Sequence, residues 1–194
     1  MNFIAIETST NICSVSLFIN SELKDIMQEE TREHSKSLPI FVSKLLNKKD
    51  LKLDYIALSI GPGSFTGLKV GTSFSKGLAA ALSIPIIPIN TFDGMKYDIK
   101  DRKIFYIATH SHRQYAFTHL YGNKVENSNF KCIEIDKLDN HQIYGYGFPD
   151  YCKVKYIKIK PSSEKIGLLS LKKFNSLKNK SIDNINPIYL TLET

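Results

Sequence analysis

The histidines are the residues of this 194-residue chain best suited to hold a metal ion or to move a proton. His34 begins an expected helix, but the residue four positions later is Leu38. Two histidines at i and i+4 share one helix face and can share one metal, so His34 alone predicts no metal site. We expect it to be a helix-start or surface residue.

His110 and His112 form a second candidate pair. If the strand expected from Ile104 to Thr109 continues, both side chains lie on one face and could share a metal. No carboxylate or thiol stands at an obvious third position. We therefore favour strand-end or loop histidines, and the sequence predicts no metal site and no cofactor.

A glycine-rich turn, Gly61-Pro62-Gly63-Ser64, follows the strand expected from Tyr55 to Ile60 and precedes a helix. Backbone N–H groups of such a turn can bind phosphate at the positive end of the helix. The signal is weak, because no Gly-Lys-Ser/Thr follows and the glycines lack dinucleotide-binding spacing. The chain's motifs assemble no general acid–base pair, Ser-His-Asp set or Cys-His nucleophile, so we predict no catalytic residues.

The helix expected from Thr66 to Leu82 carries two stripes, each with a four-residue repeat. The apolar stripe comprises Val70, Phe74 and Leu78. The second stripe consists of small residues, namely Gly67, Gly71, Ser75 and Ala79. Glycine inside a soluble helix costs about 1 kcal/mol relative to alanine, so the small stripe indicates that another backbone lies against it. The sheet of the same domain or a partner's helix could supply that backbone, and spacing alone favours the sheet.

The composition indicates a folded chain without a membrane span. Hydrophobic residues are 42% and charged residues 23%, which permits a packed core. The net charge of +7 could serve a nucleic acid or an acidic partner, but we attribute it to solvated lysines. Three cysteines without CxxC spacing argue against a disulfide framework or structural zinc. The N-terminus lacks a targeting pattern, so we expect a cytoplasmic protein with no membrane partner.

The first half has a regular order of elements. Strands are expected at residues 3–6, 13–19, 23–28, 55–60 and 84–89, and helices at 34–47 and 66–82. Hairpins followed by α-β crossovers describe a mixed sheet, with an antiparallel and a parallel part. The prolines of the last strand favour an edge position. This is the order of the ribonuclease H-like fold, which is found in actin, chaperone ATPases and sugar kinases.

The second half is expected to be a shortened unit. Strands are expected at residues 103–108, 115–121, 130–135, 154–159 and 188–190, and one helix begins at Pro161-Ser162-Ser163-Glu164. At least one helix is missing relative to the first half. We predict an α/β fold of two ribonuclease H-like units, the second reduced, with a first domain at 1–98 and a second at 99–194. A cleft closed by such a short second unit is a poor candidate for an independent ATP site.

Several segments resemble the bacterial TsaB (YeaZ-type) family. They are MNFIAIETSTNICSVSL, REHSKSLPIFVSKLL, LDYIALSIGPGSFTGLKVGTSFSKGLA and the ending PIYL. The likeness is closest over residues 1 to about 95 and most specific at GPGSFTGLKVG. Members of this family take part in forming threonylcarbamoyladenosine at position 37 of tRNA.

The resemblance implies a non-catalytic partner subunit. It would pair through first-domain helices with the catalytic subunit TsaD, which modifies tRNAs reading codons that begin with A. The ATPase TsaE would join the pair, tRNA would be reached through the complex, and the chain alone could form a homodimer. The implied partner-binding residues are Leu38, Phe41, Leu45, Gly67, Val70, Gly71, Phe74, Ser75 and Leu78. A bulky residue at Gly71 is then expected to abolish pairing while the chain stays folded.

The chain departs from its relatives at three points. Only His34 remains of the His-x-x-x-His pair that holds a metal in the catalytic subunit, and Thr191 stands where the family often has arginine. In the superfamily the first hairpin holds phosphate, but Glu7 replaces the common aspartate. We interpret Glu7, Thr8 and Ser9 as a degenerate phosphate loop, most simply a polar turn. The alternatives are a stand-alone nucleotide-binding enzyme, a metallopeptidase-like protein of the same superfold, and a plain tRNA-binding protein.

Overall fold

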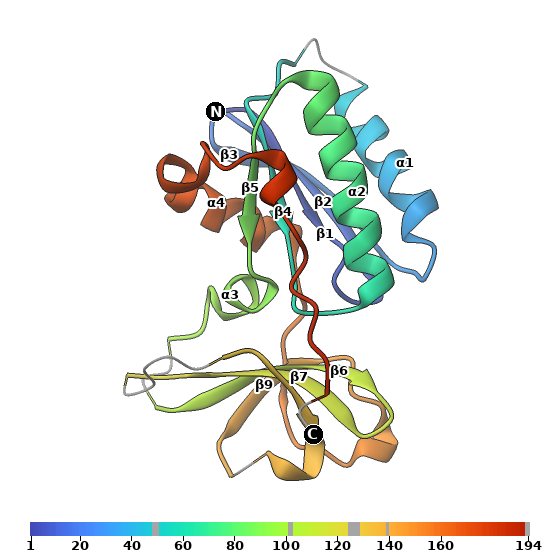
Figure 1. Cartoon of the computed structure of the whole chain (residues 1–194), viewed down its shortest axis with the longest axis vertical. Helices are drawn as coiled ribbons and strands as arrows, with labels where there is room; N and C mark the ends of the chain where they lie inside the picture. The colour runs from blue at the N-terminus through green and yellow to red at the C-terminus, as the bar shows by residue number, and fades with distance from the viewer. Residues whose placement is uncertain (48–50, 101–102, 124–128, 139, 193–194) are drawn as a thin grey trace.

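A computed structural model describes residues 1–47, 51–100, 103–123, 129–138 and 140–192. Figure 1 shows two sheets, one above the other, with helices mainly around the upper one. The expected helix end at residues 48–50 and the expected start of the second half at residues 101–102 lie outside the described residues. Within the ranges that are described, no helix has the length and apolar content needed to cross a bilayer.

The upper unit begins with three strands and then alternates helices with strands. Its elements are β1 (Phe3–Glu7), β2 (Ile12–Ile19), β3 (Glu22–Glu30), α1 (His34–Leu46), β4 (Tyr55–Ser59), α2 (Phe65–Leu82), β5 (Ile86–Ile89) and α3 (Thr91–Lys96). The strand order is β3-β2-β1-β4-β5. Strands β1, β2 and β3 pair antiparallel, whereas β1, β4 and β5 pair parallel. The predicted mixed sheet is confirmed, and β5, which contains Pro88, lies at its edge as expected.

Helices cover both faces of the upper sheet (Figure 1). Successive side chains of a strand point to opposite faces of the sheet, so each strand contributes side chains to two hydrophobic cores. Ile4 and Ile6 of β1 pack with α1 and α2 in one core. Phe3 and Ala5 pack against helix α4 (Ser163–Leu177) in the other. The upper sheet is therefore the middle layer of a three-layer α/β sandwich.

Helix α4 begins near the predicted start but packs on the upper sheet, although it follows the lower sheet in the chain. The Ser163 hydroxyl lies 2.6 Å from that of Ser14 and 2.5 Å from that of Ser16, both on β2. Ile185, beyond α4, is also buried in the upper unit. The division at residue 98 stays a prediction, but packing joins α4 to the first unit.

The lower sheet repeats the strand order of the upper one. Its elements are β6 (Phe105–His112), β7 (Tyr115–Tyr121), β8 (Lys131–Glu134), η1 (Ile135–Lys137), β9 (Gln142–Tyr146), η2 (Asp150–Cys152) and β10 (Ile157–Lys158). The order is β10-β9-β6-β7-β8, antiparallel from β6 to β8 and parallel from β6 to β10. Short 3-10 helices η1 and η2 stand where α1 and α2 stand in the first sheet's sequence of elements. That the second unit is a reduced copy stays a prediction.

Two strand predictions for the second half are wrong. The strand expected at residues 154–159 is only the two-residue β10, because within this segment only Ile157 and Lys158 pair with β9. The strand expected at 188–190 is absent from the described tail. The Ile188 N–H still donates to the Ile60 carbonyl over 2.7 Å, so the tail runs beside the end of β4 without pairing further.

Candidate functional site

Helix α2 is fixed to the first hairpin at its N-terminal end. Ser64 is the N-cap, and its hydroxyl oxygen accepts a bond from the Gly67 N–H over 3.3 Å. The Ser64 N–H in turn donates to the Ser9 carbonyl over 2.7 Å. The other end of the helix closes on Ser83, which adopts a left-handed conformation with φ of 54°. Ser64 therefore caps the start of α2.

The small stripe of α2 packs against this hairpin. A Cβ added at Gly67 or Gly71 would overlap Thr8, at the backbone carbonyl or the hydroxyl respectively. The Thr8 hydroxyl donates to the Gly67 carbonyl over 2.9 Å, and Ser75 is fully buried. The expectation that Gly67 and Gly71 meet a partner is therefore corrected, because the chain's own hairpin occupies that side; Ser75 is corrected as well, because it is buried within the chain. The interpretation favoured from spacing, packing within the domain, describes the stripe.

Three expected partner-binding residues of α1 are likewise part of the core. Leu38, Phe41 and Leu45 are buried with residues of β1 and β2, so they are not available to a partner of the folded chain. Their spacing made an apolar face, and the sheet covers it. The apolar ridge of α2, comprising Val70, Phe74 and Leu78, is only partly buried against the same core. It is the part of the predicted set that stays accessible.

A partly exposed stripe on α2 shares two residues with that ridge, and we call it the outer stripe. It comprises Val70, Phe74, Gly77 and Ala81, at i, i+4, i+7 and i+11. A Cβ at Gly77 would meet no atom within 4 Å, so this glycine faces open space. On neighbouring α1, Ile40 is 42% exposed. Gly77 and Ala81 were not among the predicted residues, although their helical recurrence with Val70 was available in the sequence.

The degenerate phosphate loop is largely occupied by internal contacts. Glu7 ends β1 with no exposed surface, and one of its carboxylate oxygens accepts from the Ser9 N–H. Burial raises the pKa of the Glu7 carboxyl above its usual value. Thr8 uses its hydroxyl to hold α2. Of the three residues, Ser9 lines the cleft described below.

The candidate metal-binding histidines, His34, His110 and His112, do not form a cluster. Of the two expected roles for His34, helix start or surface residue, the first is confirmed: His34 begins α1 and is only 5% exposed. Its Nε2–H donates to the Thr10 carbonyl over 2.9 Å, and burial lowers its pKa. A bulge separates His110 from His112 at the end of β6, and the two rings contact different neighbours. Throughout the described ranges, no three His, Cys, Asp or Glu side chains lie close enough to hold a metal.

A cleft of about 660 Å³ lies between the two units. The upper unit contributes the hairpin after β1 and the first residues of α1 and α2, and the lower unit contributes β6, β7 and β9. Beside the cleft, two hydrogen bonds join the units. The Glu30 carboxylate at the end of β3 accepts one from the Tyr146 hydroxyl over 3.2 Å and one from the Lys160 ammonium over 2.9 Å. These contacts lower the pKa of Glu30. The cleft is thus framed by polar loops on both sides.

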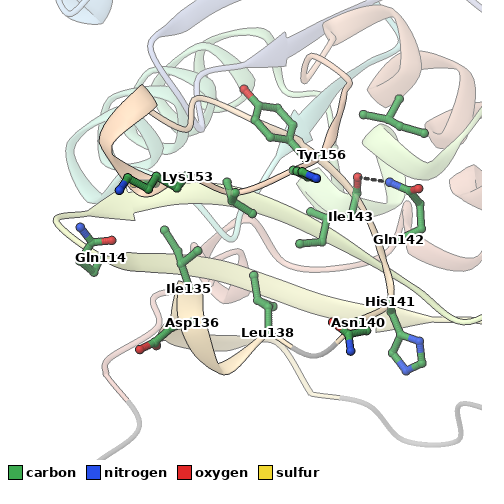
Figure 2. A pocket seen from close by; sticks show the side chains of 14 residues that line it. Gln114, Ile135, Asp136, Leu138, Asn140, His141, Gln142, Ile143, Lys153 and Tyr156 are labelled. Atoms are coloured by element: carbon green, nitrogen blue, oxygen red, sulfur yellow. Dashed lines mark hydrogen bonds between the residues drawn. The ribbon is translucent and has the colours of Figure 1, made fainter.

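A second hollow of about 720 Å³ lies on the lower unit (Figure 2). Ile135, Leu138, Ile143 and Tyr156 line it, with Lys153 at one end and His141 at the other. The hollow sits beside η1 and the segment before β10, away from the hairpin and helix starts that frame the cleft. The first hairpin and the glycine-rich turn, both singled out in the sequence, contribute Ser9 and Ser64 to the cleft, whereas no sequence motif pointed to the second hollow.

Comparison with known proteins gives partial and full-length matches. A family model described as TsaD, tRNA N6-adenosine threonylcarbamoyltransferase, matches residues 25–110. The tRNA threonylcarbamoyladenosine biosynthesis protein TsaB of Haemophilus influenzae is 36% identical over 49% of this chain and 42% of its own length. The TsaB protein of Buchnera aphidicola from Acyrthosiphon pisum is 26% identical over 96% of both chains. Apart from this second protein, the matched segment spans less than half of the first TsaB relatives.

A solved structure shows the same fold over nearly the whole chain. YeaZ from Pseudomonas aeruginosa superposes with a TM-score of 0.74 at 20% sequence identity, covering 97% of this chain and 99% of that one. The chain is a two-unit α/β protein, and both of its sheets have the same mixed topology. Its first unit exposes part of the apolar face of α2. The chain is thus similar to TsaB proteins in sequence, over 96% of both chains for the Buchnera protein, and shares the fold of the YeaZ structure.

Proposed function

We propose that this chain is a non-catalytic partner subunit in the formation of threonylcarbamoyladenosine in tRNA. Its partner would be a TsaD-type transferase acting on tRNAs that read codons beginning with A. A TsaE-type ATPase would join the pair, and tRNA would be reached through the complex in the cytoplasm. The names of the TsaB relatives and the TsaD-family match over residues 25–110 support this role.

The outer stripe of α2 is the single observation that carries the docking part of the proposal. Val70 and Phe74 leave part of their apolar surface in water, while Gly77 and Ala81 add no bulk. Small residues let a second helix approach closely, and apolar neighbours supply the contact area. The stripe contains no charged residue, which suits the centre of a protein interface. We infer that it packs against a helix of the transferase, or against a second copy when the chain is alone.

The buried residues of the predicted set support the same interface indirectly. Gly67 and Gly71 bring α2 close to the hairpin, and Leu38 anchors α1 on the sheet. The two helices pack against each other, so they present one continuous face. A preformed face loses little conformational freedom on binding, which favours affinity. These residues would position the docking surface without touching the partner.

The variant Gly77→Arg tests the proposal. Position 77 has open space, so the chain should fold, but the long charged side chain would stand in the interface. We expect affinity for the TsaD-type protein to fall at least about tenfold, as for other central interface positions. Asn175→Arg is the matched control, because Asn175 is exposed on α4, across the sheet from α2. Equal affinities of the two variants and the parent chain would contradict the proposed surface.

A further inference from the structure

The outer face of the lower sheet has little helical cover. Along β6, Phe105 and Ile107 pack with Phe92 of α3, which lies between the two sheets (Figure 1). Tyr106 and Ala108 belong to the core on the opposite face, because side chains alternate along a strand. Among the described residues from 103 to 160, the helical elements are η1 and η2, of three residues each. Both faces of the upper sheet, by contrast, are covered by helices of 13 to 18 residues.

The hollow of about 720 Å³ shown in Figure 2 opens onto the core of this outer face. Its floor combines buried and partly buried apolar side chains, namely Ile135, Leu138, Ile143, Val154 and Tyr156. Pockets that bind ligands usually measure about 300–1,000 Å³, so the hollow has a suitable size. Apolar surface that stays in water gains free energy when a partner buries it. The hollow therefore offers apolar contact area that the described part of the chain leaves uncovered.

Two lysines without ion pairs stand at the rim of the hollow. Lys153 and Lys155 both line it and are exposed. Lys160, further along the same segment, pairs with Glu30 over 2.9 Å, whereas Lys153 and Lys155 have no ion pair within the described ranges. Of the lining residues that the structure describes, only Asp136 is acidic. The rim thus carries an excess of positive charge, which suits acidic groups on the molecule that covers the hollow.

The backbone at Lys153 gives a separate indication. Its φ is 49°, in the left-handed region that favours glycine over residues with a side chain. A lysine at this position costs stability relative to glycine, and such costs are found where a side chain has a function. The long charged side chain of Lys153 is therefore expected to act outside the fold, on a partner.

We propose that the hollow is a docking groove for an amphipathic helix of a partner protein, with acidic residues beside its apolar face. The apolar face contacts Ile135, Leu138 and Ile143, and the acidic flank meets Lys153 and Lys155. The bound helix covers the lower sheet as α1 and α2 cover the upper sheet, at the place where the chain itself has only η1 and η2. Helices of this kind bind hydrophobic grooves through side chains at i, i+3, i+4 and i+7.

A protein helix fits the hollow better than a nucleic acid does. Nucleic-acid binding depends on many phosphate contacts, and two lysines beside a carboxylate supply few of them. The apolar floor instead suits aliphatic side chains. Neither the outer stripe of α2 nor the cleft takes part, so this inference does not depend on the proposed subunit role.

The experiment titrates the full chain with synthetic peptides and follows its amide NMR signals. The probe is a helix of about 14 residues, held by a side-chain crosslink, with leucines on one face and glutamates beside them. One comparison peptide has lysines in place of the glutamates, and another has the same composition in scrambled order. We expect saturable shifts of the Leu138, Ile143 and Val154 amides with the acidic peptide. The two comparison peptides should bind at least about tenfold more weakly.

Variants of the chain separate the apolar floor from the charged rim. Leu138→Asn keeps a side chain of similar size and should weaken binding at least about fivefold, because apolar contact is lost. Lys153→Gly should weaken binding by about threefold without harming the fold, since glycine suits the left-handed backbone. Lys44→Gln is the matched control, because Lys44 is exposed on α1 of the upper unit, and it should leave binding unchanged.

Several results would overturn the proposal. Equal binding of the three peptides, or equal affinity of Leu138→Asn and the parent chain, would exclude the groove. Shifts at Val70 and Phe74 in place of the hollow would show that the peptide binds the outer stripe instead. Concentration-dependent shifts around the hollow without peptide would make a second copy the occupant. The titration uses no TsaD-type protein, so its failure leaves the proposed subunit role untouched, and a failure of TsaD binding leaves the groove untouched.

Discussion

Gly71 and Gly77 lie on the same helix, but Gly71 faces the buried hairpin and Gly77 faces open space. Replacing each with alanine should therefore change the free energy of unfolding in opposite directions. A Cβ at Gly71 would overlap the buried hydroxyl of Thr8, whereas a Cβ at Gly77 would meet no atom within 4 Å. Alanine is about 1 kcal/mol better than glycine inside a helix. Gly77→Ala is therefore expected to stabilise the chain by about 1 kcal/mol.

For Gly71→Ala the helical gain is opposed by overpacking. Added methyl groups in a well-packed core typically cost about 1–3 kcal/mol, and here the obstructing group is held by its own bond to the Gly67 carbonyl. We expect a net loss of up to about 2 kcal/mol in the free energy of unfolding. This replaces the expectation that a larger residue at Gly71 would spare the fold and affect only pairing.

A double-mutant cycle tests whether the destabilisation by Gly71→Ala comes from contact with Thr8. Thr8→Ala removes the hydroxyl that a Cβ at position 71 would meet, so adding Gly71→Ala to it should be neutral or stabilising by about 1 kcal/mol. Urea unfolding followed by circular dichroism gives all four free energies. If Gly71→Ala is as stable as Gly77→Ala, or if the Thr8 background does not relieve its cost, the packing of α2 on the hairpin is wrong.

Two further predictions concern the core. Because burial raises the Glu7 pKa above its usual 4.5, the folded chain favours the protonated carboxyl, and the free energy of unfolding should fall as pH rises above that value. Glu7→Gln should flatten this dependence and stabilise the chain at neutral pH; identical pH slopes in urea unfolding would contradict it. Ile166→Ala should destabilise the chain by about 2–4 kcal/mol, because Ile166 is buried between α4 and the upper sheet. A loss under about 0.5 kcal/mol would show that α4 does not depend on that sheet.

Much of the first unit could be predicted because its patterns are local. The alternation around Ile4 and Ile6, the hairpins and the capped start of α2 each indicate one structure within a few residues. The parallel order then follows from right-handed crossovers. The second unit was harder. β9 escaped prediction because Gln142 and Gly145 interrupt its apolar pattern, and Gly145 is needed where a Cβ would lie 2.7 Å from the Ala108 carbonyl.

The site depended on contacts between residues far apart in the chain. The stripe of small residues marks Gly71 as a closely packed position, but no local signal shows that Thr8 is the residue it meets. The docking of α4 on the upper sheet rests on Ser163 meeting Ser14, a pairing that no spacing rule predicts. The cleft likewise joins loops of both units, so its full lining became visible only when the chain was folded.

The central claim is that the outer stripe of α2 docks a TsaD-type transferase. The most direct measurement is the mass in solution, by light scattering, of the chain alone and mixed with the TsaD-type protein of the same organism. We predict a one-to-one complex that Gly77→Arg prevents and Asn175→Arg leaves intact. No complex with the parent chain, in the presence or absence of ATP, would contradict the account.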